Sequence, residues 1–140
     1  MKYRNVKTTV NGILFDSKME ADYYLYLLEQ KDIANLELQP KFLLMPAFKK
    51  LGRTIRKTEY IADFLITYSD GSRLAIDVKG MTTQAFKIKE KLFHFNHPDL
   101  ELVLITKHNN AWIELKDKPK RKTLKKVGKQ RGIQKRKLQG

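Results

Sequence analysis

Cysteine is missing from this chain of 140 residues, and its absence excludes several classes of protein. A chain without cysteine has no disulfide framework, no thiolate zinc site, no iron–sulfur cluster and no cysteine nucleophile. The sequence also has no apolar run near the roughly 20 residues of a membrane span, and its first ten residues lack the apolar core of a signal peptide. We therefore expect a cytoplasmic protein that makes no membrane contact.

Acidic residues are scarce as well, since 15 Asp and Glu stand against 29 Lys and Arg, for a net charge of +14. The excess is concentrated in residues 117–140, which contain eleven basic residues and a single acid. Apolar residues thin out there, so we expect one folded domain over residues 1–116 and a tail that is disordered without nucleic acid. This distribution is typical of proteins that bind a polyanion, most often nucleic acid. The tail residues expected to contact phosphates include Lys120, Arg121, Lys122, Lys125 and Lys126.

The hydrophobic pattern of the first 116 residues is that of an α/β protein. Asn11-Gly12 is a hairpin signal within residues 6–15, and a helical pattern runs from Ser17 to Lys31. Thr82 can cap a second helix, which would carry the chain across the sheet and make the next strand parallel to the previous one. We expect a mixed sheet flanked by helices, with an irregular strand at 36–45, further strands at 60–68, 74–78, 100–106 and 111–115, and the second helix at 83–96.

Apolar stripes predict which face of each helix is buried. In the first helix the stripe is Ala21, Tyr24, Leu25 and Leu28. In the second helix it is Ala85, Ile88, Leu92 and Phe95.

Three polar side chains lie where the strand pattern calls for apolar ones. Asp63 interrupts the strand that begins near Tyr60, and Asp77 and Lys79 are two residues apart on the next strand, so they share one face of it. Burying a carboxylate is costly unless it is paired or binds a metal ion. These three residues are therefore candidates for a functional site.

The turn between these strands decides whether the two aspartates meet. A two-residue loop would place Asp63 opposite Val78, whereas a three-residue loop over residues 69–71 would place it directly opposite Asp77. Glycine suits the left-handed last position of the longer loop, which Gly71 would occupy. Opposite residues lie about 4.5–5.5 Å apart, and two carboxylates at that distance repel each other unless a divalent cation compensates them.

Glu20 is the third candidate acid. Ser17 and Glu20 have the spacing of a capping box, and acids suit the first turn of a helix. Glu20 also lies on the same helical arc as Tyr24, Leu27 and Leu28, so its side chain is expected to face the core. A capping role and a role in the site both remain open.

These residues together resemble the PD-(D/E)XK nuclease superfamily. Asp63 precedes Asp77-Val78-Lys79 on the next strand, and Glu20 lies on an earlier helix, in an element order similar to the superfamily's αβββαβ core. Over about residues 10–106 the chain is also similar to small phage proteins that are predicted endonucleases related to junction resolvases and transposon-end nucleases. The stretches that carry this narrower similarity are Gly12–Ala21, Leu38–Pro40, Tyr60–Phe64 and Asp77–Gly80. Ala62 stands where the superfamily frequently has proline.

The resemblance implies a restriction-endonuclease-like fold and a Mg²⁺- or Mn²⁺-dependent endonuclease that cuts DNA. It implies a branched substrate such as a Holliday junction and a role in phage recombination or replication in the host cytoplasm, and it is compatible with a homodimer. Asp63, Asp77 and the carbonyl of Val78 would bind the metal, with Glu20 as an outer or second-metal ligand. Lys79 would orient or deprotonate water and stabilise the charged phosphorus centre, although a surface lysine paired with Asp77 is the simpler interpretation of its spacing.

Residues around the second helix are weaker candidates for phosphate contacts. An ordinary capped and solvated helix explains them at least as well. They are Thr82, Thr83, Gln84, Lys87 and Lys91.

Two other functions remain open. One is a nickase or nuclease without preference for branched DNA, and the other is a non-catalytic nucleic-acid-binding module. The acid set Glu20, Asp63 and Asp77 discriminates against the second, because clustered acids repel phosphate. Gln39 could reach the site, whereas His94 and His97 lack partner acids at zinc-site spacing and are expected to be structural.

Overall fold

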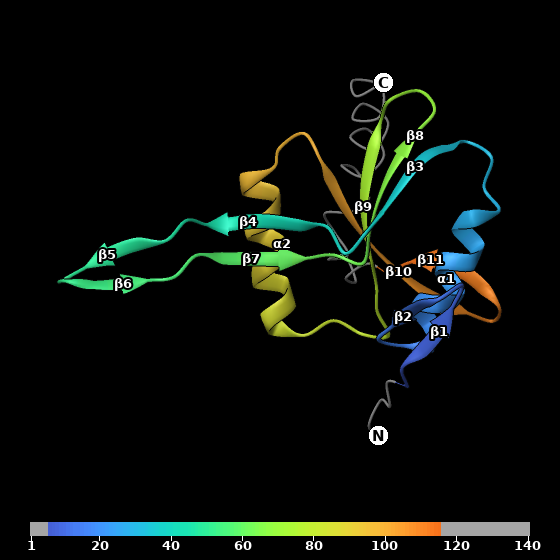
Figure 1. The fold of residues 1–140 in the computed structure, drawn as a ribbon, viewed down its shortest axis with the longest axis horizontal. Coiled ribbons are helices and arrows are strands. Elements are labelled where there is room, and N and C mark those ends of the chain that lie inside the picture. The colour runs from blue at the N-terminus through green and yellow to red at the C-terminus, as the bar shows by residue number, and fades with distance from the viewer. Residues whose placement is uncertain (1–5, 116–140) are drawn as a thin grey trace, which may run out of the picture.

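The computed structural model describes residues 6–115 and shows a mixed α/β protein built on a five-stranded mixed sheet and two helices (Figure 1). The basic tail and its five candidate phosphate contacts lie outside the described residues. No helix within residues 6–115 is both long and apolar enough to cross a bilayer. The elements in chain order are β1 (Thr8–Val10), β2 (Ile13–Phe15), α1 (Lys18–Leu28), β3 (Ile33–Leu38), β4 (Lys41–Met45), β5 (Phe48–Lys50), β6 (Arg53–Ile55), β7 (Thr58–Ile61), β8 (Phe64–Tyr68), β9 (Arg73–Val78), α2 (Gln84–Asn96), β10 (Glu101–His108) and β11 (Ala111–Glu114).

The central sheet has the strand order β11-β10-β9-β8-β3. The predicted crossover is confirmed, since α2 lies between β9 and β10 in the chain and these two strands are parallel. All other neighbours in the sheet are antiparallel. The predicted hairpin around Asn11-Gly12 is also confirmed, with both turn residues at positive φ between β1 and β2.

The β8–β9 hairpin has the predicted three-residue loop. The backbone N–H of Tyr68 donates to the carbonyl of Ser72 at 2.8 Å, and Gly71 has φ of +92°. A side chain at this φ is strained, so glycine is the residue that suits the position. The ladder runs from the pair Thr67 and Arg73 to the pair Phe64 and Ile76, the register that the longer loop requires, and Asp63 and Asp77 are the next residues along it.

Each face of the sheet is covered by one helix. Ala21, Tyr23 and Leu27 of α1 pack into the core on one face, together with alternate residues of β8 and β9. Phe86 and Phe93 of α2 pack into a second core on the opposite face. The sheet therefore lies between two helices, and residues that follow one another along β9 point into different cores.

The predicted stripe of α1 is wrong in part. Ala21 is fully buried as expected, but Leu25 and Leu28 are 42% and 51% exposed, and Tyr23 is buried in their place. Tyr23 contacts Trp112 of β11 edge-on, with ring centroids 4.8 Å apart. This contact joins residues distant in sequence, so the local pattern of the helix did not indicate it.

The predicted stripe of α2 is wrong. Ile88 and Phe95 are 59% and 82% exposed, whereas Phe86 and Phe93 are buried. The helix carries two apolar stripes, and the buried one is that of Phe86 and Phe93, whose rings contact Tyr60 and Phe42. The cap is also shifted by one residue, because the hydroxyl of Thr83, and not that of Thr82, accepts from the N–H of Phe86 at 3.1 Å.

Two predicted strands are each divided in the structure. Residues 36–45 contribute to β3 and β4, which separate at Gln39, a residue with φ of +49°. Residues 60–68 contribute to β7 and β8, and Ala62 and Asp63 link them. The chain leaves the main sheet after β3 and returns to it at β8, and no sequence pattern had indicated the intervening β5 and β6.

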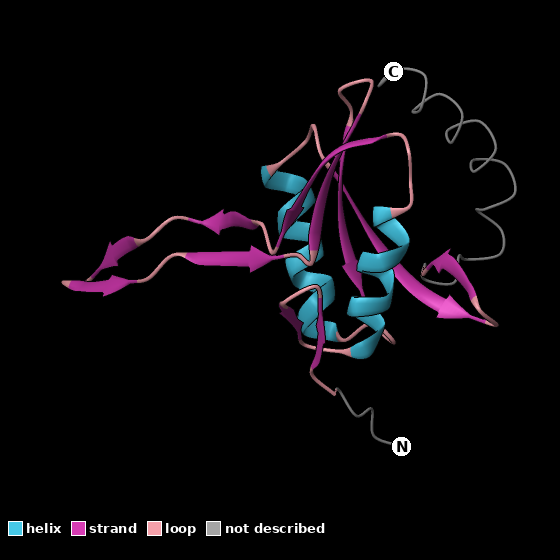
Figure 2. Cartoon of the chain, turned by 45° about the vertical axis from the view of Figure 1, so that its right-hand side comes forward, coloured by secondary structure: helices cyan, strands magenta, loops and turns pink. Residues whose placement is uncertain are grey.

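The segment between these breaks forms a long two-stranded arm, β4–β7 continued by β5–β6, which projects away from the rest of the molecule (Figure 2). Its base is fixed to α2, because the rings of Phe42 and Phe93 lie edge-to-face at 5.0 Å and the side chain of Asn96 donates to the Leu44 carbonyl at 2.8 Å. Between Pro46 and Lys57 no side chain is fully buried. The arm is thus anchored at one end only.

Candidate functional site

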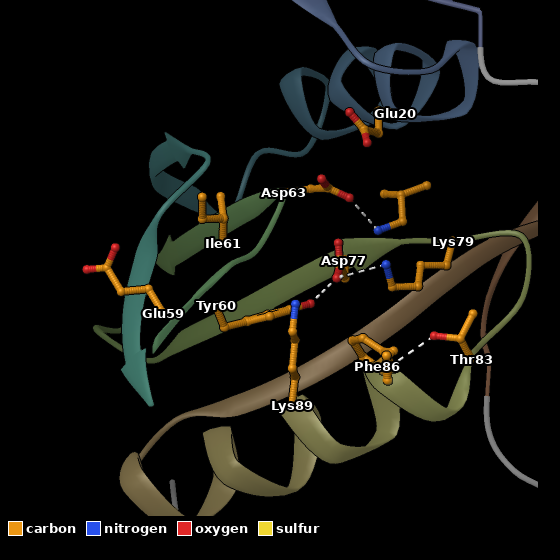
Figure 3. Close-up of a pocket in the computed structure, with 12 residues that line it drawn as sticks. Glu20, Glu59, Tyr60, Ile61, Asp63, Asp77, Lys79, Thr83, Phe86 and Lys89 are labelled. Atoms are coloured by element: carbon orange, nitrogen blue, oxygen red, sulfur yellow. Dashed lines mark hydrogen bonds and ion pairs between the residues drawn. The ribbon is translucent and has the colours of Figure 1, made fainter. Parts of the chain in front are cut away.

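The three predicted carboxylates and the predicted lysine line a single cavity of about 430 Å³ at one end of the sheet, together with Glu59 and Lys89 (Figure 3). Glu20 comes from the first turn of α1, and Asp63 comes from the link between β7 and β8. Asp77 is near the end of β9, and Lys79 follows that strand directly. Three separate segments of the chain thus bring together the four residues that the sequence predicted as catalytic.

Asp77 is the most buried of the acids, with 4% of its surface exposed. Its Oδ2 atom accepts a hydrogen bond from the Tyr60 hydroxyl and lies 3.4 Å from the Lys79 ammonium nitrogen. Burial raises the pKa of Asp77 to about 6, and the charge and hydrogen bond of Lys79 oppose the rise. The carboxylate is therefore held in place by two partners but is only partly compensated for the loss of water.

Lys79 is held between Asp77 and an aromatic ring. Its ammonium nitrogen lies 4.9 Å from the ring centroid of Phe86, a cation–π contact, and 29% of its side chain is exposed. The ion pair with Asp77 that the simpler interpretation required is present. It lies inside the cavity rather than on the open surface, so the lysine lines the same cavity as the three acids.

Glu20 and Asp63 form the second pair of the site. The pKa of Glu20 is raised to about 8, chiefly by burial and in addition by the charge and the side-chain hydrogen bond of the neighbouring Asp63. Burial also raises the pKa of Asp63, while the N–H of Val78, which donates to its Oδ2 at 2.7 Å, acts in the opposite direction together with Glu20 and Lys79. The two carboxyl groups hold a proton between them more readily than either would in water.

Glu20 takes part in the helix cap and also lines the cavity. The hydroxyl of Ser17 accepts from the backbone N–H of Glu20 at 3.1 Å, so the residue is part of the predicted helix cap. Its side chain points toward Asp63 and lines the cavity (Figure 3). Capping uses the backbone of this residue and leaves the carboxyl group available to the site.

The weaker candidates at and before α2 do not all line the same hollow. Only Thr83 of that group lines the cavity of the acids. Gln84, Lys87 and Lys91 line a separate hollow on α2, and Thr82 lines another between α2 and the sheet. Lys89 also lines the cavity, although no sequence motif indicated it. It lies three residues after Phe86 and therefore on the same face of the helix.

Two further residues of the site were missed or undervalued. Tyr60 was predicted only as part of a strand, but its hydroxyl donates to Asp77. A buried tyrosine near a buried acid was the available signal, because a buried tyrosine hydroxyl usually has a hydrogen-bond partner. Gln39 lies beside the acids, since it lines a neighbouring hollow with Glu20 and Asp63 and its N–H donates to the Asp63 carbonyl at 2.9 Å.

The donor set can be tested against the divalent cation that the resemblance implies. Within residues 6–115, no three His, Cys, Asp or Glu side chains converge closely enough to form a ready-made metal cage. Magnesium, however, retains several waters and usually takes only one or two protein carboxylates. Asp63 and Asp77 open into the same cavity, and both have raised pKa values because their negative charges are poorly compensated there. Their donor chemistry fits a hydrated Mg²⁺ or Mn²⁺ ion.

The comparisons with known proteins identify a family. No curated protein and no solved structure matches the chain. A family model described as "Protein of unknown function (DUF1064)" matches residues 1–111, which include every residue of the candidate site. The chain therefore belongs to the DUF1064 family.

Proposed function

We propose that this protein is a metal-dependent DNA endonuclease that hydrolyses phosphodiester bonds, with branched DNA such as a Holliday junction as its leading substrate. The observation that carries the proposal is the cavity in which Glu20, Asp63, Asp77 and Lys79 meet, in a chain whose net charge is +14. A protein that only binds nucleic acid gains nothing from three acids at a phosphate site, because they repel the ligand. A nuclease needs them to hold a cation.

The proposal extends to the fold. The resemblance to the PD-(D/E)XK superfamily predicts a restriction-endonuclease-like αβββαβ core, with its acids at the ends of two neighbouring strands. The order α1, β3, β8, β9, α2, β10 and the pairing of β8 with β9 support that prediction. On this proposal the arm is an insertion between the first and second core strands.

Each residue of the cavity has a task in the proposed reaction. Asp63, Asp77 and the carbonyl oxygen of Val78 would hold the cation, and Glu20 would act as an outer ligand. When bound, Mg²⁺ or Mn²⁺ polarises the scissile phosphate and lowers the pKa of a bound water. Tyr60 keeps the Asp77 carboxylate in position through its hydrogen bond.

Lys79 would act on the reacting atoms. Its ammonium nitrogen lies 3.4 Å from the carboxylate of Asp77. There it orients the attacking water and stabilises the extra negative charge on the phosphate oxygens. The oxygen of the water forms a bond to phosphorus and the bond from phosphorus to the leaving sugar oxygen breaks. The proton of the water passes to solvent, and the leaving oxygen takes a proton from solvent, while Lys79 stays charged.

A homodimer is part of the proposal, because symmetric resolution of a junction needs two active sites. The exposed stripe of α2 supports it. Ile88, Leu92 and Phe95 are 59%, 37% and 82% exposed and lie on one side of the helix. A second copy that covered this stripe would bury apolar surface that now contacts water.

The test is a cleavage assay with linear, forked and four-way DNA in Mg²⁺, Mn²⁺ or EDTA. We expect cleavage that requires metal, favours the branched substrates and is abolished in Lys79→Ala, while that variant binds DNA nearly as well as the wild type. Asp70→Asn is the matched control, because Asp70 is an exposed acid on the same β8–β9 hairpin, outside the cavity. A wild-type protein that binds DNA but cuts none of the substrates with either metal would instead indicate a non-catalytic binding module. The excess of basic residues is the observation that favours this second candidate.

A further inference from the structure

The two-stranded arm formed by β4–β7 and β5–β6 contains the surplus positive charge of the folded domain. Residues 38–58 contain six Lys or Arg and no acid, whereas the rest of residues 1–116 contains 12 basic and 14 acidic residues. Among the described residues, Lys57 pairs with Glu59 at 3.4 Å, but Lys49, Lys50, Arg53 and Arg56 make no ion pair. An exposed, uncompensated basic ribbon is complementary to a polyanion.

The end of the arm presents an apolar side chain. Leu51 is 89% exposed and forms with Gly52 a two-residue turn in which both residues have positive φ, +46° and +79°. Asparagine, aspartate or glycine is preferred at the first position of such a turn, so leucine is unfavourable there both for the backbone and for hydration. Lys50 and Arg53 are paired across the ladder directly behind it. An apolar tip between two basic residues is the arrangement that inserts between bases while phosphates are held on either side.

The arm begins at the candidate site. Glu59, Tyr60 and Ile61 of β7 line the cavity of the acids, and the same strand continues into the arm (Figure 1). The nine residue steps from Tyr60 to Leu51 span about 30 Å at roughly 3.3 Å per residue. DNA rises about 3.4 Å per base pair. The tip therefore reaches about nine base pairs from a phosphate bound at the cavity, or almost one helical turn.

We propose that this arm lies against duplex DNA, roughly parallel to the helix axis, on one side of the scissile phosphate and that Leu51 is a wedge that enters a groove and contacts the bases about nine base pairs away. The inference rests on the proposed function, since the cavity defines where the cut phosphate lies. A two-stranded ribbon fits the major groove, and apolar wedges such as leucine are typical of arms that enter the minor groove. In both cases the basic residues contact phosphates and the tip contacts bases.

The charge of the arm is tested by binding to a duplex in EDTA, so that the result is independent of cleavage. In a variant with Lys49, Lys50, Arg53 and Arg56 all changed to Gln, we expect the slope of log affinity against log salt to flatten by about 0.9 for each phosphate that the arm no longer neutralises. Arg73→Gln, which changes an exposed arginine on the β8–β9 hairpin, is the control and should leave the slope nearly unchanged. A fourfold variant with a circular dichroism spectrum and a salt slope like those of the wild type would overturn the proposal.

The wedge is tested by Leu51→Asn, which removes the apolar side chain and places a residue that favours positive φ in the turn. We expect a folded protein that binds duplex DNA about tenfold more weakly, since one apolar contact of ordinary size corresponds to such a factor. The control is Leu28→Asn, which changes a leucine on α1 that is 51% exposed. A fluorescent adenine analogue about nine base pairs from the cut should brighten with the wild type, as its base unstacks, but not with Leu51→Asn.

The results separate this inference from the proposed function. If the arm variants lose affinity in EDTA but no protein cuts DNA, the arm is a duplex-binding element and the nuclease proposal fails. If the wild type cuts DNA and Leu51→Asn binds, cuts and brightens the analogue as well as the wild type does, the wedge is refuted.

Discussion

Replacing Asp77 by asparagine should make the metal-free protein more stable while it abolishes cleavage. The pKa of Asp77 is raised from 3.8 to about 6, which corresponds to about 3 kcal/mol of cost for carrying the charge in the folded state, at 1.36 kcal/mol per pKa unit. Asparagine has the same shape without the charge, and its amide oxygen can still accept from the Tyr60 hydroxyl. Because Lys79 loses its partner, we expect a net gain of about 1–3 kcal/mol in the free energy of unfolding at pH 8.

The pH dependence identifies the cause of this gain. A group whose pKa is higher in the folded state binds its proton more tightly there, so stability falls as the pH rises from 3.8 to about 6 and stays low above that range. The difference between wild type and Asp77→Asn should therefore be full at pH 8 and close to zero at pH 3.5. Urea denaturation in EDTA at pH 3.5, 5, 6 and 8 measures it, and both proteins retain Glu20 and Asp63, so their own titrations largely cancel.

Asp70→Asn is the matched control, because the pKa of Asp70 is shifted in the opposite direction and the expected change in stability has the opposite sign. Hydrogen bonds from the hydroxyl and the N–H of Ser72 lower the pKa of Asp70, so this exposed charge favours the folded state above the unfolded pKa and loses that effect in acid. We expect Asp70→Asn to reduce stability at pH 8. An Asp77→Asn protein that is less stable than the wild type at pH 8, or whose gain is equal at pH 3.5 and 8, would refute the burial argument. Full cleavage by Asp77→Asn would refute its place in the site.

Three further predictions concern the site and its surroundings. Glu20→Gln should retain more cleavage than Asp77→Asn in parallel single-turnover assays, since glutamine also suits a helix cap and Glu20 is assigned as an outer ligand. An equal loss of cleavage in the two variants would indicate that Glu20 is a direct metal ligand. Truncation after Leu115 should flatten the salt slope of DNA affinity by several units and leave the melting temperature unchanged, because it removes most of the net charge; an unchanged slope in a folded truncated protein would exclude the tail from DNA binding. Phe95→Asp should convert the proposed homodimer to a monomer in sedimentation experiments, and a wild type that is already monomeric at micromolar concentration would refute the homodimer.

The meeting of the acids could be predicted from the sequence because it depends on local chemistry. Gly71 selects the loop, the loop selects the register, and the register determines which residue lies opposite Asp77. The spacing of Asp77 and Lys79 then places both on one strand face. None of these steps requires knowledge of residues far away in the chain, and the structure agrees with each of them.

The helix faces and the arm could not be predicted in the same way. Both helices have more apolar residues than one face can hold, so the choice between stripes was made by distant partners, Trp112 for α1 and Phe42 for α2. The arm was missed because Pro40 and Pro46 suggested an irregular segment, and because β5 and β6 have only three residues each and bury no side chain fully. Hydrophobic periodicity reports burial, and a ribbon that buries nothing has no such period.

The separation of charge along the molecule explains how a site with three acids can serve a polyanion. The acids lie in the cavity, while the surplus positive charge of the folded domain lies on the arm that begins at the edge of that cavity. Affinity for DNA would then come from the arm and the tail, and the cavity would contribute chemistry and little or no binding. On this division, Asp77→Asn should bind DNA in EDTA as tightly as the wild type or more tightly, because it removes a charge that repels phosphate. The fourfold Gln variant of the arm should show the reverse: weaker binding, and a cleavage rate that recovers at saturating protein because its cavity is intact. If the arm variant stayed inactive at saturation, the arm would act in positioning the scissile phosphate and not only in binding.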